Sequence, residues 1–252
     1  MFRLLRRLFG RRYRPPRSLL QRILRRLALV PVALAVLSIL AAASLRWLDP
    51  PTTAFMLRDE MQARAAGRDD YRLRHYWVNW EHISPAARIA VVAAEDQRFL
   101  SHSGFDLESI AEAVHQRAKS GRVRGASTIS QQVAKNLFLW PAQSFLRKGV
   151  EAYFTSLIEF FWPKQRILEV YLNVAQFGEG IFGIEAASIT YFCKTADELT
   201  SREAATLAAV LPDPVDLRVD RPSPYVRSRS RWILSQVAML GGAGHLGDLA
   251  KH

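Results

Sequence analysis

The 252-residue sequence contains a single cysteine, Cys193, which excludes an intramolecular disulfide and any metal site built from cysteines alone. Its six histidines include no His-Glu-x-x-His pattern and no other pair at metal-ligand spacing. The sequence also has no Gly-x-Ser-x-Gly elbow and no phosphate-binding loop that ends in Gly-Lys-Ser/Thr. It therefore lacks the local signatures of serine hydrolases, His-Glu-x-x-His zinc enzymes and P-loop nucleotide-binding proteins.

Acidic residues are missing from residues 1–26, which contain ten arginines. The rest of the chain has 25 basic and 23 acidic residues, so the net charge of +12 comes from this tail. A basic tail beside an apolar segment is typical of membrane topology rather than of nucleic-acid binding. We therefore expect no nucleic-acid partner.

One long uncharged segment follows the tail, from Leu27 to Leu45, and the sequence has no second one. Its 19 residues are close to the ~20 that a helix needs to cross the bilayer. The preceding arginines predict a cytoplasmic N-terminus and an extracytoplasmic position for the chain that follows. The alternative is a cleaved signal peptide, with Ala41-Ala42-Ala43 as the cleavage site, but the length of the segment favours an anchor at 27–45.

Beyond the anchor we predict a connector at 46–75 and one globular domain at 76–252. Ser84-Pro85 predicts the start of a helix that ends near Phe99, and Thr128 with Gln131 predicts a capping box at the start of another. Further helices are expected at 145–162, 164–174, 181–192, 201–211 and 224–240. No run alternates convincingly as a strand, so the predicted fold class is mainly α.

Two adjacent acids, Glu95 and Asp96, stand in the last turn of the first of these helices. The helix C-terminus, the neighbouring Asp96 and partial burial would all raise the pKa of Glu95, which makes this carboxylate a candidate general base. The alternative is a surface ion pair between Glu95 and Arg98 at i,i+3 spacing. His102, in the loop that follows, is expected to be a structural hydrogen-bond partner.

The segment from Gly125 to Asn136 contains a glycine-led loop that opens into a helix. Free N–H groups at a helix start, together with the helix dipole, form a site for an anion. Thr128, Gln131 or Gln132, and Lys135 share one helix face, which could hold a phosphate or a pyrophosphate. The alternative is an ordinary capping box on an amphipathic helix.

A third segment places Arg147 and Lys148 one helical turn before Glu151. A surface salt bridge explains this spacing, and so does a second carboxylate held beside two cations near a phosphorylated sugar. Taken individually, Asn173 and Glu185 are typical of structural positions, a helix end and a cap partner.

Together these segments resemble, in order, the five motifs of the family 51 glycosyltransferases, and among them the monofunctional peptidoglycan transglycosylases of Gram-negative bacteria. The residues that carry the resemblance are Glu95-Asp96-x-x-Phe99-x-x-His102-x-Gly104, Gly125-Ala126-Ser127-Thr128-Ile129-x-Gln131-Gln132-x-x-Lys135-Asn136, Arg147-Lys148-x-x-Glu151, Ile167-Leu168-Glu169-x-Tyr171-Leu172-Asn173 and Glu185-Ala186-Ala187-x-x-x-Tyr191-Phe192. The match extends over about residues 76–240.

The resemblance implies a lysozyme-like helical domain that polymerises lipid II with inversion and releases undecaprenyl pyrophosphate. Glu95 would take the proton from the acceptor 4-hydroxyl, and Glu151, the second catalytic carboxylate, would orient the nearby cations or a divalent metal. The residues implied to bind substrate are Ser127, Thr128, Gln131, Gln132, Lys135, Asn136, Arg147 and Lys148.

The resemblance implies no organic cofactor and leaves open a divalent cation, Mg²⁺ or Mn²⁺. The expected partners are lipid II, the growing glycan strand on undecaprenyl pyrophosphate, the inner membrane, and proteins of cell division or wall synthesis. The catalytic domain would lie in the periplasm. A serine-x-x-lysine with a later lysine-threonine-glycine is absent from the sequence, so no transpeptidase activity is expected.

One departure from the family pattern is Gln143, which stands where relatives commonly carry an arginine thought to face the pyrophosphate. Two other functions stay open: a lysozyme-like lytic enzyme that cleaves glycan, and an inactive membrane-anchored scaffold of the division machinery. A lytic enzyme has no use for a phosphate-binding helix start with Lys135 and the Arg147-Lys148 pair, and intact Glu95 and Glu151 argue against a scaffold.

Overall fold

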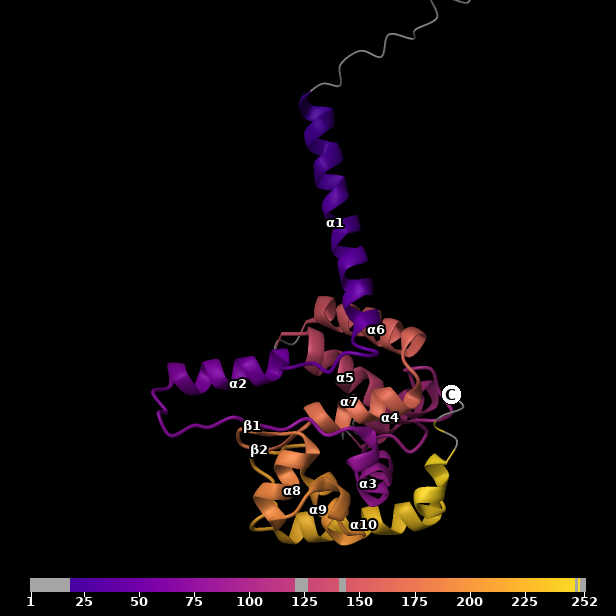
Figure 1. Ribbon diagram of the computed structural model, residues 1–252. Coiled ribbons are helices and arrows are strands. Elements are labelled where there is room, and N and C mark those ends of the chain that lie inside the picture. Colours follow the sequence, from indigo (N-terminus) through magenta and orange to yellow (C-terminus); the bar gives the residue numbers. More distant parts are fainter. Residues whose placement is uncertain (1–18, 121–126, 141–143, 248, 250–252) are drawn as a thin grey trace, which may run out of the picture. The chain divides into compact units, whose positions relative to one another are not determined.

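The computed structural model describes residues 19–120, 127–140, 144–247 and 249. It divides into two compact units, Met1–Ala41 and Ala42–His252. The described part of the first unit is formed by helix α1 (Leu19–Ser44), which contains Pro31 and ends in the second unit (Figure 1). Within the described residues, no helix combines the length and the apolar character needed to cross a membrane.

The second unit is mainly helical, which confirms the predicted fold class. Its α-helices are α2 (Ala54–Ala65), α3 (Pro85–Glu95), α4 (Leu107–Ser120), α5 (Ile129–Phe138), α6 (Phe145–Phe161), α7 (Lys164–Val174), α8 (Ile184–Phe192), α9 (Ser201–Val210) and α10 (Pro224–Met239). Short 3₁₀ helices lie at Trp80–His82, Ala196–Glu198 and Gly242–Leu246.

Three short strands form a small sheet that the sequence did not predict. They are β1 (Arg74–His75), β2 (Gln176–Gly178) and β3 (Ile181–Phe182), in the order β1-β3-β2. β1 runs parallel to β3, and β2 runs antiparallel to it. The helix expected at 181–192 therefore begins only at Ile184, because the two residues of β3 precede it.

The first predicted helix ends earlier than expected, at Glu95 rather than near Phe99. Ser84 caps its start by accepting a hydrogen bond from the Ala86 N–H, and Pro85 occupies the first turn as predicted. At the other end the backbone of Asp96 leaves the helical conformation, with φ −159° and ψ 77°. Glu95 is therefore the last residue of α3.

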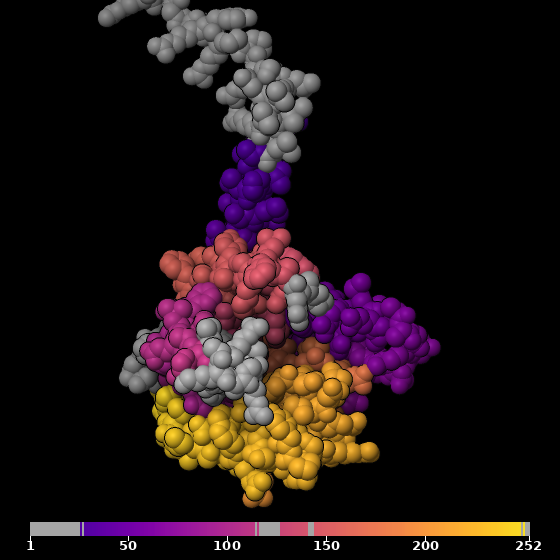
Figure 2. All heavy atoms as spheres, turned by 180° about the vertical axis from the view of Figure 1, so that it is seen from behind, coloured from indigo at the N-terminus to yellow at the C-terminus, as the bar shows by residue number. Residues whose placement is uncertain are grey.

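In the core, small residues of α3 pack against small residues of α9. Ala90 and Ala93 of α3 and Ala205 and Ala208 of α9 are all nearly inaccessible. Alanine faces let two helix backbones approach closely, and α9 in turn packs against α10. Seen from behind, α6 and α10 lie on opposite sides of this unit (Figure 2).

The segment predicted as a connector, 46–75, is part of the second compact unit. Thr53 caps α2 by accepting a hydrogen bond from the Met56 N–H (3.2 Å), and the Met56 side chain is buried. Helix α2 packs against α5, and β1 joins the sheet. This segment therefore reaches the neighbourhood of the predicted substrate-binding helix.

Candidate active site

Glu95 is half-buried at the end of α3, a helix with a buried apolar face, and it turns toward α5. Its Oε2 accepts a hydrogen bond from Gln132 Nε2 at 2.7 Å. The Tyr171 hydroxyl donates to the other end of that amide, Gln132 Oε1, at 3.2 Å, so the amide group can present only its N–H₂ end to Glu95. The carboxylate is thus held by a side chain whose orientation is fixed from α7.

Burial raises the pKa of Glu95 above its ordinary value of 4.5. The hydrogen bond from Gln132 and the charges of Arg229 and Lys135 act in the opposite direction, while Asp96 raises the pKa again. A carboxylate whose pKa is raised in this way is suited to accept a proton near neutral pH. The alternative pairing with Arg98 does not occur, because Arg98 forms ion pairs with Asp106 (3.7 Å) and with Glu108.

Asp96, by contrast, is built into the fold. His102 Nε2 lies 3.0 and 3.1 Å from the two carboxylate oxygens of Asp96, and the Gly104 N–H donates to His102 Nδ1. The proton of the imidazole therefore lies on Nε2 and is donated to Asp96, as expected for a structural histidine. The Ile129 N–H, at the start of α5, donates to Asp96 Oδ2 at 3.0 Å. One buried carboxylate thus joins the end of α3 to the start of α5.

The predicted capping box at the start of α5 is confirmed: Thr128 and Gln131 exchange side-chain and backbone hydrogen bonds. Thr128 Oγ1 also donates to the Gly104 carbonyl. The side chains of Thr128 and Gln131 are both buried. The sequence left open a phosphate or pyrophosphate site at this helix start, with an ordinary capping box as the alternative. In the structure the carboxylate of Asp96 occupies part of that position. Binding of substrate by Thr128 and Gln131 stays a prediction.

The third predicted segment surrounds a buried carboxylate with cations. Lys148 Nζ donates to Glu151, and Arg147 Nη1 lies 3.6 Å from the second carboxylate oxygen. Burial lowers the pKa of Lys135, while Glu151 raises it and Arg147 lowers it, so α5 brings Lys135 within reach of both charges. Two cations of α6 thus contact one carboxylate, Lys135 of α5 adds a third positive charge, and the excess positive charge is suited to an anionic group.

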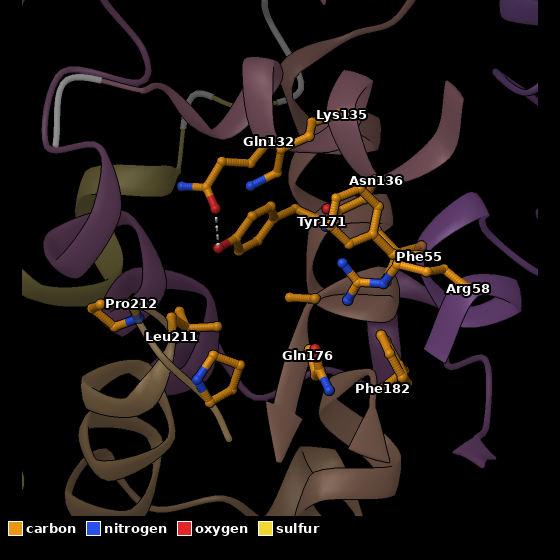
Figure 3. A pocket seen from close by; sticks show the side chains of 13 residues that line it. Phe55, Arg58, Gln132, Lys135, Asn136, Tyr171, Gln176, Phe182, Leu211 and Pro212 are labelled. Carbon is orange, nitrogen blue, oxygen red and sulfur yellow. Dashed lines mark hydrogen bonds between the residues drawn. The ribbon is translucent and has the colours of Figure 1, made fainter. Parts of the chain in front are cut away.

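Two adjoining cavities lie on either side of Gln132. The larger, of about 680 Å³, is lined by Glu95, Ser127, Thr128 and residues of α10. The smaller, of about 180 Å³, is lined by Lys135, Asn136 and residues of α2 and α7 (Figure 3). Gln132 and Pro212 line both. The candidate base and the candidate anion site therefore share one continuous surface.

Arg229 of α10, which the sequence did not indicate, lines the larger cavity. Its guanidinium lies 4.1 Å from the centre of the Trp232 ring, and Nη2 donates to the Ala94 carbonyl at 3.0 Å. The sequence likewise did not indicate the contact of Tyr171 with Gln132, although Tyr171 lies within the fourth motif. Both act on Glu95 across more than 70 positions of sequence, so no local spacing could have indicated them.

Two residues of the later motifs have structural contacts. The buried Asn173 side chain accepts a hydrogen bond from the Val78 N–H (2.8 Å) and donates to the carbonyls of Val78 and Glu169, both at 2.9 Å. Glu185 accepts a hydrogen bond from the Ala196 N–H at 2.7 Å. Gly125, Ala126 and Gln143, which the sequence also singled out, lie outside the described residues.

The residues near Glu151 do not suit a divalent metal. This carboxylate already contacts Lys148 and lies beside Arg147, so an added cation would meet positive charge. Among the described residues, no three or more His, Cys, Asp or Glu side chains gather closely enough to hold a metal ion.

The geometry agrees with the comparison to known proteins. The family model described as Transglycosylase matches residues 61–238. A protein named biosynthetic peptidoglycan transglycosylase from Xanthomonas campestris pv. campestris (strain B100) is 50% identical over 233 residues, which is 92% of this chain and 94% of the relative. A protein of the same name from Pseudomonas entomophila (strain L48) is 48% identical over 231 residues, which is 92% of this chain and 98% of the relative. Another, from Xylella fastidiosa (strain M23), is 47% identical over 222 residues, which is 88% of this chain and 91% of the relative. The chain belongs to the transglycosylase family.

Proposed function

We propose that this protein polymerises the glycan strands of peptidoglycan during cell-wall synthesis. The donor is the growing strand on undecaprenyl pyrophosphate, the acceptor is lipid II, and the product bond is a β-1,4 link. The observation that carries this proposal is the placement of the Glu95 carboxylate and of Lys135 on the two sides of Gln132, each lining one of the two cavities. We further infer a lysozyme-like arrangement for the helical domain, as the resemblance implies.

In the proposed reaction Glu95 accepts the proton of the acceptor 4-hydroxyl as that oxygen attacks the anomeric carbon of the donor. The bond between the anomeric carbon and the pyrophosphate breaks on the opposite face, so the configuration inverts. Lys135, Arg147 and Lys148 stabilise the negative charge that grows on the leaving pyrophosphate. Glu151 keeps the two cations of α6 in position. We assign to the residues of this chain the polymerisation step alone, without transpeptidation.

We also propose that the protein is anchored in the inner membrane by residues 27–45, with its helical domain in the periplasm. Both substrates are lipid-linked, so an anchor keeps the enzyme beside them. Three apolar side chains of α6 are strongly exposed, with relative accessibilities of 100% for Phe145, 73% for Leu146 and 81% for Phe160. Exposed apolar residues grouped on one helix support contact with a lipid surface.

A reporter fused after His252 tests this topology. A reporter that is active only in the periplasm should function there. Activity restricted to a reporter that works only in the cytoplasm would refute the proposed orientation.

The function is tested with the purified full chain in detergent. It should convert labelled lipid II into polymer without ATP, and the phosphoglycolipid inhibitor moenomycin should block this conversion. Lack of polymer under conditions in which the protein is folded and binds lipid II would refute the proposal. Release of fragments from pre-formed glycan would instead favour the lytic alternative.

A further inference from the structure

Helix α2 contributes two side chains to the smaller cavity, although its segment of the sequence was predicted to be only a connector. Phe55 and Arg58 line this cavity together with Lys135 of α5. The capped start of α2, the buried Met56 and the packing of α2 on α5 fix the position of both side chains. Neither residue belongs to the five motifs.

Within the residues that the structure describes, the guanidinium of Arg58 has no partner of opposite charge. Its carbon lies 4.8 Å from the centre of the Phe55 ring, and its Nε is buried without a hydrogen-bond partner among the described residues. Across the described part of the chain, no carboxylate comes within ion-pair distance of Arg58. Arg64 on the same helix differs in each respect, because it is exposed and pairs with Glu60 at 2.6 Å. A buried N–H group without an acceptor is unfavourable, and an arriving acceptor would relieve that cost.

A second cation approaches the same aromatic ring from α5. Lys135 Nζ lies 5.7 Å from the centre of the Phe55 ring. Figure 3 shows Arg58 and Lys135 extending toward the cavity from two different elements. The described lining holds these two cations and the amides of Gln132, Asn136 and Gln176, but no carboxylate. Two cations and several amide donors in a lining that contains no carboxylate are the chemistry of an anion-binding site.

We propose that Arg58 and Lys135 together bind an anionic group of the lipid-linked substrate in this smaller cavity. The inference rests on the proposed function, and it adds to that function a cation from a segment that precedes all five motifs. Two anionic groups of the substrate fit this chemistry, the pyrophosphate and the carboxylates of the stem peptide. Arginine suits either, because its planar fork can donate two parallel hydrogen bonds.

The test compares Arg58→Gln, Arg58→Lys and the matched control Arg64→Gln in the full-length protein in detergent. The Gln substitution at Arg58 removes the charge but keeps a hydrogen-bond donor, and Lys restores the charge. Arg58→Gln should lower kcat/KM for lipid II by about tenfold to a hundredfold, the usual effect of losing a charged hydrogen bond. Arg58→Lys should recover part of this loss, and Arg64→Gln should behave as wild type.

Two substrates distinguish the anionic groups: lipid II, and a lipid II whose peptide carboxylates are amidated. A lower kcat of Arg58→Gln with both substrates identifies the pyrophosphate, because its charge grows in the transition state. A higher KM that occurs with lipid II alone identifies the peptide carboxylates. Unchanged kcat and KM with both substrates would overturn the inference. So would an equal loss in the Gln and Lys variants together with a matching fall in melting temperature, since that pattern belongs to a packing role.

Direct binding separates this inference from the proposed function. Undecaprenyl pyrophosphate and amidated lipid II, titrated into the wild-type protein and into Arg58→Gln, report binding whether or not polymer forms. If the wild type forms no polymer, the proposed function fails. Equal affinity of the two proteins for these probes and for lipid II would then refute the role of Arg58 as well.

Discussion

Replacement of Glu95 by glutamine tests the centre of the proposed mechanism. Glutamine has nearly the same shape as glutamate but cannot take a proton at neutral pH. The surroundings of the side chain should remain in place, because Gln132 is held by Tyr171 and Asp96 is held by His102 and the start of α5. Removal of general-base catalysis should lower the polymerisation rate by about 10²–10⁴.

The same substitution should leave the stability of the fold at neutral pH within about 1 kcal/mol of the wild type, or above it. Burial raises the pKa of Glu95, so the folded state binds this proton more tightly than the unfolded state does. The resulting stabilisation is complete below the ordinary pKa of 4.5 and is lost as the pH rises through the pKa of the folded state. Glutamine stays neutral throughout and avoids that loss. It also exchanges a charged hydrogen bond from Gln132 for a neutral one, at a cost of about 1 kcal/mol.

The assay measures three quantities on the purified variant: polymerisation rate, binding of moenomycin, and melting temperature between pH 4 and pH 8. We expect a lost rate, retained binding, and a melting temperature within about 4 °C of wild type or above it, since 1 kcal/mol corresponds to roughly 2–4 °C at this size. The melting temperature of the variant relative to that of the wild type should increase as the pH rises. A near-normal rate would remove Glu95 from the mechanism. Loss of rate, binding and stability together would make it a structural residue.

Three further substitutions test other parts of the site. Arg229→Gln removes a charge that lowers the pKa of the proposed base, so the acid limb of the rate–pH profile should move to higher pH; an unmoved limb would contradict this. Asn173→Ala leaves the buried N–H and C=O groups of Val78 without their side-chain partner, and thermal melting should show a loss of about 2–5 kcal/mol, whereas a change below 1 kcal/mol would contradict the structural role. Gln143→Arg should raise the turnover of lipid II, and more so in an Arg58→Gln background; an unchanged rate in both backgrounds would show that the added cation does not reach the pyrophosphate.

Local sequence was informative where a structural rule acts over a few residues. Ser84-Pro85 and the Thr128–Gln131 pair correctly located the starts of α3 and α5, because caps are formed by neighbouring side chains and backbone groups. The same reasoning placed α7 within Lys164–Val174. It found no sheet, because strands of two or three residues are too short to show an alternating pattern.

The residues of the candidate site also divide into those that local sequence indicates and those that only the packing of helices brings together. The sequence indicated Glu95 as one of two adjacent acids at a helix end, and it indicated Lys135 and the Arg147–Glu151 pair by helical spacing. Arg229 and Tyr171 reach Glu95 only through the packing of α10 and α7, which no local spacing reports. The contribution of Arg58 was hidden for a further reason. The proline pair and polar composition of its segment resemble a linker, and only the contact of α2 with α5 reveals its place.

The carboxylate of Asp96 has a consequence for how successive sugars are added. This carboxylate accepts hydrogen bonds from His102 and from the first amide of α5, and the backbone of Asp96 ends α3. Asp96 therefore connects α3, which carries Glu95, to α5, which carries Lys135. Reacting atoms must approach within about 3–3.5 Å, and two helices cross-braced in this way keep that spacing through every cycle. We therefore expect no hinge between α3 and α5 during elongation.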